Sequence, residues 1–273
     1  MAAISEKILL LGRGLYGGEI PDTLTLKSIP TSSELDYVGS EDFIPTLLDK
    51  IFPQAIEEKC NFHNLLEIDF HWICRALRIL NYGPYHTTNA IFCPECGAVS
   101  RGEYRVDLRT IPVKELPGNF ENKIVIPKSE FIAFNGDVVL KLPTIQEILN
   151  AHKDKMFVLD NGEQNTDLAR MCYMIKSIKG ESNLSPVDVK QKIRSEMIDA
   201  DFKLLTQVVK ELTDYGLRAG GATVCPKCNS GEATFIALVD DRFFRPTLGD
   251  LRAWKADRCA EGSSGSGKGD NKN

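Results

Sequence analysis

Two short cysteine motifs, far apart in the sequence, constrain the fold of this chain more than any other feature. They are Cys93-Pro94-Glu95-Cys96-Gly97 and Cys225-Pro226-Lys227-Cys228-Asn229. In each motif two thiolates a few residues apart can hold one face of a tetrahedral ion, at Zn–S distances of about 2.3 Å. The fifth residue is Gly97 or Asn229, and both types tolerate the left-handed backbone that turns amides toward the sulfurs. The spacing predicts two cysteine knuckles that share one zinc ion.

The residues around both knuckles are typical of β-strands. Residues 90–92 and 102–106 flank the first knuckle, and residues 222–224 and 231–236 flank the second. Two such hairpins facing each other make a zinc ribbon with four cysteine ligands, a closed site that is structural rather than catalytic. Closing so long a loop costs roughly 4 kcal/mol of entropy, whereas a structural zinc contributes about 10–16 kcal/mol in small peptides. The alternative is two independent cysteine pairs that are either redox-active or merely reduced. A redox pair usually sits at a strand-to-helix turn, and neither knuckle leads into a helical pattern.

Composition and charge exclude several classes of protein. The chain has 273 residues, 42% hydrophobic and 26% charged, which is ordinary for a globular protein. Its 33 basic and 38 acidic residues give a net charge of −5, which argues against nucleic acid as the main partner. The apolar run at residues 8–11 is too short for a signal peptide, and no run approaches the roughly 20 residues of a membrane span. In a reducing compartment, clustered cysteines indicate metal ligands.

The hydrophobic pattern predicts an α+β fold in which helical segments alternate with β-hairpins. We expect an extended N-terminal arm at 1–40, a helical segment at 41–84, a β-rich segment with the first knuckle at 85–142, about four helices at 143–219, the second knuckle hairpin with an aromatic segment at 220–258, and a disordered tail at 259–273. Within this scheme Asn135-Gly136 predicts a hairpin turn, and Ser185-Pro186 predicts the start of a helix. The polar tail cannot offset its ordering entropy by burial.

Other motifs suggest chemistry but have a simpler interpretation. Residues 12–17 match G-x-G-x-x-G, yet strand alternation follows instead of the helix that a dinucleotide site requires, so a glycine-bearing loop is expected. Cys60, His63, His71 and Cys74 could form a second metal site across two helices, although a buried thiol and a hydrogen-bonded histidine are commoner. No nucleophile elbow, zinc-protease or calcium-loop string occurs. We therefore expect a protein that is not an enzyme.

Five motifs follow one another in a recognisable order. They are Gly14-Leu15-Tyr16, RALRILNYGP at 75–84, FCPECG at 92–97, VDL at 106–108 and VKELP at 113–117. This order resembles the baseplate hub family of contractile-tailed bacteriophages, whose members share a glycine-tyrosine arm, a helix ending in R-x-x-x-Y-G, and a CPxCG knuckle followed by DL. The resemblance covers residues 12–157 and continues less firmly through the second knuckle to residues 243–246.

The resemblance implies a structural or assembly role in the baseplate hub. Its partners would be other baseplate and tail proteins, and its location the virion tail after assembly in the host cytoplasm, with no nucleic acid, membrane or small-molecule substrate. Carried over to this sequence, the zinc ligands would be Cys93, Cys96, Cys225 and Cys228.

Residues from two segments are candidates for contact with partner proteins. In the arm they are Leu15 and Tyr16, and in the aromatic segment Phe243, Phe244 and Arg245, because adjacent aromatic residues with arginine are enriched at interfaces. A simpler alternative places one phenylalanine in the core and one at the surface. Two competing functions remain open at this point: a zinc-ribbon protein that binds nucleic acid, and an enzyme whose zinc is structural.

Overall fold

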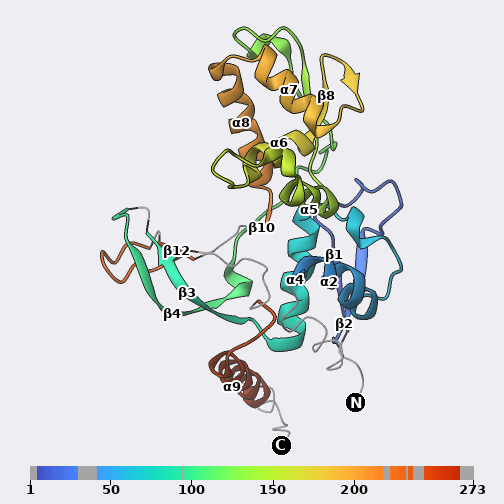
Figure 1. Ribbon diagram of the computed structural model, residues 1–273. Helices are drawn as coiled ribbons and strands as arrows, with labels where there is room; N and C mark the ends of the chain where they lie inside the picture. The colour runs from blue at the N-terminus through green and yellow to red at the C-terminus, as the bar shows by residue number, and fades with distance from the viewer. Residues whose placement is uncertain are drawn as a thin grey trace, which may run out of the picture.

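The computed structural model describes residues 5–29, 42–93, 95–217, 222–231, 233–235 and 243–264. These residues form α-helices and four small sheets in which every strand pair is antiparallel, so the predicted α+β class is confirmed. Buried side chains gather in two clusters, one in a central region around a long helix and one in an upper lobe (Figure 1). A β-sheet extends from the central region as a wing (Figure 1).

The central region combines a β-hairpin with a bundle of helices. The hairpin pairs β1 (Ser5–Leu9) with β2 (Thr23–Lys27). The helical part consists of α2 (Phe43–Thr46), the π-helical turn η1 (Leu47–Ile51), α3 (Phe52–Ala55) and α4 (Glu67–Tyr82). Residues 5–29 differ from the expected extended arm, because Leu24 and Leu26 are completely buried in the central core. Strand alternation was visible in the sequence, but the helices that cover this hairpin come from later in the chain.

The glycine-rich segment forms the loop between β1 and β2. Gly14 and Gly17 have positive φ angles of 77° and 59°, which a side chain would strain. The loop is held on α4 by the buried carboxylate of Asp69, which accepts hydrogen bonds from the amides of Leu11 (2.6 Å) and Gly12 (3.0 Å). Tyr16 also donates its hydroxyl to Asp69. The segment is thus a loop fixed by a carboxylate, as expected from the absence of a following helix.

The end of α4 is where several segments meet. Gly83 ends the helix at φ 80°, and a Cβ there would lie 2.3 Å from a ring atom of Trp254, so only glycine fits. The fully buried Arg78 donates to the carbonyls of Gly83 (2.8 Å), Tyr85 (2.6 Å) and Phe243 (2.7 Å). One guanidinium therefore satisfies backbone oxygens from segments far apart in the sequence.

The upper lobe packs four helices against a four-stranded sheet. The strands are β6 (Ile124–Ile126), β7 (Val138–Leu140), β8 (Ile175–Ile178) and β9 (Glu181–Ser182), and the helices are α5 (Ile145–Lys153), α6 (Thr166–Met174), α7 (Pro186–Glu196) and α8 (Asp199–Thr213). The predicted helix start at Ser185-Pro186 is confirmed, with a capping box between Ser185 and Asp188. The short β8–β9 hairpin interrupts the stretch that was expected to be purely helical.

The hairpin turn predicted at Asn135-Gly136 is wrong. Residues 131–136 form no strand, and β7 pairs instead with β6 across a longer connection. The physical reason is Asp201 of α8, whose buried carboxylate accepts hydrogen bonds from the amides of Ile132 (2.6 Å) and Phe134 (2.8 Å). A side chain from almost 70 positions away satisfies the amides that a strand partner would otherwise have paired.

The wing contains β3 (Tyr85–Phe92), β4 (Val99–Asp107), β11 (Ala222–Thr223) and β12 (Ala233–Phe235). A separate two-residue pair, β5 (Val113–Lys114) with β10 (Gly216–Leu217), lies where the chain enters and leaves the upper lobe. The single-turn 3-10 helices are η2 (Phe62–Asn64), η3 (Leu108–Thr110), η4 (Lys128–Glu130) and η5 (Lys155–Phe157).

Helix α9 (Leu248–Ser264) packs beside β3 below the wing (Figure 1). It continues past Cys259, where a disordered tail was expected, and residues 265–273 of that expected tail lie outside the described residues. Among the described residues, none of the helices combines the length and the apolar content that crossing a membrane requires.

Candidate metal centre

The wing brings the two knuckles together in one sheet. The strand order is β11-β12-β3-β4, so the second hairpin joins the first along its edge. Strand β12 pairs with β3 through Thr234↔Phe92 and Phe235↔Ile91, directly before the first knuckle begins at Cys93. The second knuckle follows β11 on the neighbouring side. Strand pairing therefore aligns both knuckles at the same end of the sheet, as the flanking patterns predicted.

The four sulfur atoms of the knuckles form one compact cluster. The Sγ atoms of Cys93, Cys96, Cys225 and Cys228 all lie within 4.8 Å of one another. Across the two knuckles, Sγ of Cys93 is 3.6 Å from Sγ of Cys228, and Sγ of Cys96 is 3.8 Å from Sγ of Cys225. A tetrahedral site with Zn–S bonds of about 2.3 Å places its sulfurs about 3.8 Å apart. The predicted convergence of the four cysteines is confirmed, and the donor set fits one metal ion.

Backbone geometry prepares each knuckle for this role. Gly97 and Asn229 have φ angles of 65° and 57°, so both fifth positions take the left-handed conformation expected from the sequence. The amide of Cys225 donates to Ser230 O, and the amide of Lys227 points at Sγ of Cys225 at 3.4 Å. Hydrogen bonds from backbone amides, those of Cys228 and Lys227, lower the pKa of the Cys225 thiol to about 7. The pKa of the neighbouring Cys228 thiol is raised instead, so the backbone hydrogen bonds favour ionisation of Cys225 in particular, and the thiolate is the form that binds a metal.

Burial divides each knuckle in the same way. The first cysteine of each, Cys93 and Cys225, is buried, whereas the second, Cys96 and Cys228, is exposed. A metal held by these four sulfurs would have a complete tetrahedral shell with no position left for water or substrate, which is the arrangement of a structural site. The exposed half would nevertheless be open to a chelator.

The second metal site considered from the sequence does not form in the described part of the chain. His63 uses both ring nitrogens within the protein, with 2.7 Å contacts to Asp49 and Gln146. Cys74 is fully buried in the central core, and burial raises the pKa of its thiol well above the ordinary value. On the same helix as Cys74, His71 places Nε2 3.9 Å from a carboxylate oxygen of Glu67, so this pair is a partnered histidine and a core thiol, as the simpler alternative had it.

Most of the residues predicted to contact partner proteins are buried or bonded within the protein. Tyr16 bonds to Asp69 and also accepts the amide hydrogen of Leu66 at 3.1 Å, while Leu15 is half-buried against the upper core. Phe243 and Phe244 are only 2% and 1% exposed. This differs from the expected surface contact, because both rings fill the core beneath the wing. Arg245 remains exposed.

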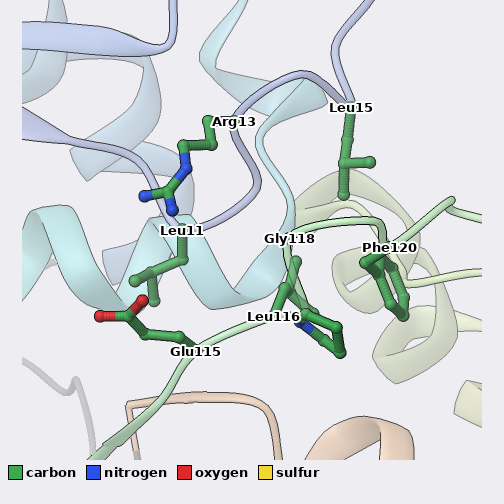
Figure 2. Close-up of a pocket in the computed structure, with 8 residues that line it drawn as sticks. Leu11, Arg13, Leu15, Glu115, Leu116, Gly118 and Phe120 are labelled. Atoms are coloured by element: carbon green, nitrogen blue, oxygen red, sulfur yellow. The ribbon is translucent and has the colours of Figure 1, made fainter.

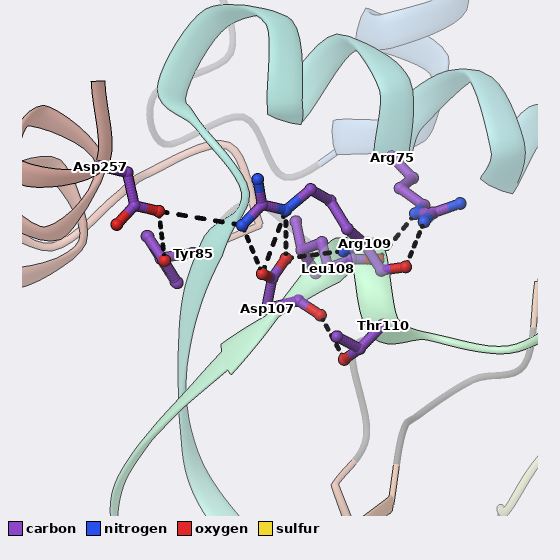
Figure 3. A network of polar contacts seen from close by, with 7 residues as sticks. All are labelled: Arg75, Tyr85, Asp107, Leu108, Arg109, Thr110 and Asp257. Atoms are coloured by element: carbon purple, nitrogen blue, oxygen red, sulfur yellow. Dashed lines mark hydrogen bonds and ion pairs between the residues drawn. The ribbon is translucent and has the colours of Figure 1, made fainter. Parts of the chain in front are cut away.

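A polar network that the sequence analysis missed fixes α9 to the wing and α4. As Figure 3 shows, Arg109 pairs with Asp107 (2.7 Å) and lies 3.8 Å from Asp257 of α9, which also accepts the hydroxyl hydrogen of Tyr85 (2.5 Å). Arg75 of α4 donates to Leu108 O at 2.8 Å. These pairs link residues up to 172 positions apart, so no local signal could reveal them.

A small hollow lies between the β1–β2 loop and residues 115–120. Figure 2 shows Leu11, Arg13 and Leu15 facing Leu116 and Phe120 across it. Its volume is about 50 Å³, far below the roughly 300 Å³ at which small-molecule pockets begin. The hollow marks a seam between the central region and the upper lobe.

Comparison with known proteins identifies no relative: no family model, no curated protein and no solved structure matches this chain.

Proposed function

We propose that this chain is a structural or assembly component of the baseplate hub of a contractile bacteriophage tail, acting through protein contacts and stabilised by one structural zinc. The observation that carries the proposal is the closed cluster of four cysteine sulfurs, drawn from two distant hairpins. A site of this kind fixes shape and leaves no coordination position for chemistry. A scaffold component needs a defined shape without needing a reaction.

The places where the hub-like motifs fall support the same role. Arg75 and Arg78 of the RALRILNYGP string bind backbone carbonyls of other segments, and Gly83 of the string makes room for Trp254. The FCPECG string supplies half of the sulfur cluster. These motifs therefore connect separate parts of the molecule, and such connections are what a scaffold protein needs to hold its shape.

Metal content tests the first part of the proposal. Protein purified without chelators should contain one zinc ion per chain by elemental mass spectrometry, and Cys225→Ser should lose it. Cys60→Ser is the matched control, because Cys60 lies outside the sulfur cluster and should leave zinc content unchanged. Chains that fold fully without bound metal would remove the structural role of zinc.

Phage assembly tests the second part. In a phage that encodes this chain, Cys225→Ser supplied in place of the natural protein should stop baseplate completion, whereas Cys60→Ser should allow normal tails by electron microscopy. Normal tails with both variants would contradict the hub assignment. Salt-dependent retention of the purified protein on DNA would instead favour the nucleic-acid-binding alternative.

A further inference from the structure

The upper lobe has an apolar groove far from the cysteine cluster. It lies between α6, α7 and the start of α8, and encloses about 400 Å³. Five apolar side chains line it: Leu168, Ile193, Met197, Ile198 and Phe202. The volume falls in the range of roughly 300–1,000 Å³ of sites that bind ligands. Ile198 is 45% exposed although it is large and apolar.

The charged groups at the groove that have no ion-pair partner are both positive. Lys190 and Arg194, one helical turn apart on α7, lie along one wall. Among the described residues neither forms an ion pair with a carboxylate. Lys190 donates to the carbonyl of Met156, and its ammonium lies 5.0 Å from the centre of the Phe157 ring. The acidic group at the groove, Asp199, is already paired with Lys203 at 2.7 Å. The rim therefore offers two cations without an anionic partner.

Exposed apolar side chains continue the surface beyond Lys190. Met156, whose carbonyl Lys190 binds, is 53% exposed, and the nearby Val158 is 44% exposed. Apolar surface that is concave and bordered by cations matches a partner helix with an apolar stripe and acidic residues on one flank.

We propose that this groove binds an amphipathic, acidic helix of a partner protein, with the helix's apolar side chains between α6, α7 and α8 and its carboxylates against Lys190 and Arg194. The inference stands apart from the hub assignment and from the metal, because no residue of the groove belongs to the wing. A partner helix fits better than a membrane surface because the five apolar residues line one hollow, which a helix can fill and a flat surface cannot.

The test uses the full chain and fluorescent peptides of about 16 residues, long enough to form a helix on binding. One peptide carries a leucine stripe flanked by glutamates, a second replaces the glutamates with glutamines, and a third replaces the leucines with serines. Affinity is measured by fluorescence anisotropy at two salt concentrations. Sedimentation with phosphatidylglycerol vesicles is measured in parallel.

Two variants separate groove binding from folding. Arg194→Glu changes an exposed side chain, and Ile198→Ser changes the N-cap residue of α8, a position where serine is preferred over isoleucine. Both variants should keep the native circular dichroism spectrum. Both should lower the affinity for the acidic leucine peptide about tenfold or more. Lys210→Glu, a charge reversal of an exposed residue elsewhere on α8, is the control and should leave affinity unchanged.

The expected result is binding of the acidic leucine peptide, weaker binding of the glutamine peptide and none of the serine peptide. Equal affinity for all three peptides, or equal affinity of the groove variants and the natural chain, would overturn the proposal. A third result would also overturn it: no peptide binds, but the chain binds vesicles and Arg194→Glu abolishes that binding. This result would assign the groove to anionic lipid.

Discussion

The upper lobe and the wing are both built around antiparallel sheets, but they are stabilised in different ways. In the upper lobe, β7 and the helices around it bury Val138, Leu140 and Leu205 completely. In the wing, the buried side chains among those described on β3 and β4 are Ile91 and Val106. A sheet with so little apolar burial needs another source of stability. The comparison predicts that a metal ion held by the four sulfurs would add to the wing the stability that its own strands supply only in small part.

Removal of the metal should have the largest effect, and only in the wing. Chelation, or Cys225→Ser, should lower the amide-exchange protection of β3 and β4 near the knuckle by about 100-fold or more, because a structural zinc contributes about 10–16 kcal/mol in small peptides. Protection in α6 and α8 should stay unchanged. Hydrogen exchange followed by mass spectrometry measures both regions in one sample. If protection in the lobe fell together with that in the wing, the two regions would not be stabilised separately.

A cavity in the upper lobe should produce the reverse pattern. Leu205→Ala removes a fully buried side chain and should lower the free energy of unfolding of the lobe by about 2–5 kcal/mol. Metal content should equal that of the natural chain, because the knuckles are not touched. Urea unfolding and elemental analysis of the same preparation check these two expectations. If the variant lost zinc in proportion to stability, the two regions would be a single cooperative unit.

A separate pH effect is expected in the central region, where Asp69 of α4 holds the β1–β2 loop. Burial, partly offset by hydrogen bonds from Tyr16, Leu11 and Gly12, raises the pKa of Asp69 to about 6. The folded chain then binds more protons than the unfolded chain, whose Asp has a pKa near 3.9, between about pH 4 and pH 6. Stability should fall as pH rises through this window, by at most about 3 kcal/mol.

Asp69→Asn tests this expectation, since the amide keeps the shape of the side chain and does not titrate. Unfolding by urea at a series of pH values should show a shallower decline for the variant between pH 4 and 6. Parallel curves for the variant and the natural chain would mean that Asp69 ionises normally in the folded state.

The smallest effect is expected where the wing meets α9. The Arg109 side chain is 50% exposed, and ion pairs of this kind contribute less than about 1 kcal/mol. Arg109→Ala should therefore shift the urea midpoint only slightly, and the shift should shrink further in high salt. A loss of several kcal/mol would show that the network in Figure 3 stabilises the wing as much as the sulfurs do.

The sequence was informative where chemistry or local propensity decides the structure. The knuckles follow from cysteine spacing, the left-handed residues Gly97 and Asn229 from their type, and α7 from its Ser-Pro cap. It gave no signal where one side chain accepts hydrogen bonds from backbone amides that are distant in the sequence. Asp69 holds amides 57 and 58 positions away, and no local pattern marks a carboxylate for that task.

The same reasoning explains the misplaced hairpin and the misjudged aromatic pair. Asn135-Gly136 is typical of a turn, but Asp201 accepts hydrogen bonds from the amides of Ile132 and Phe134 just before it. These contacts require α8 to be packed against this segment. Phe243 and Phe244 lie in the core, and Arg78 of α4 donates a hydrogen bond to the carbonyl of Phe243 there. Both outcomes depend on tertiary contacts that local sequence patterns do not encode.

The position of the knuckles also has a consequence for synthesis of the chain. Cys96 and Cys225 are 129 residues apart, and the whole upper lobe is encoded between them. At about 5–20 residues per second, the first pair of thiols leaves the ribosome roughly ten seconds before the second pair exists. The four ligands can therefore come together only after the intervening lobe has been translated, and a metal ion bound by all four would be acquired late in synthesis.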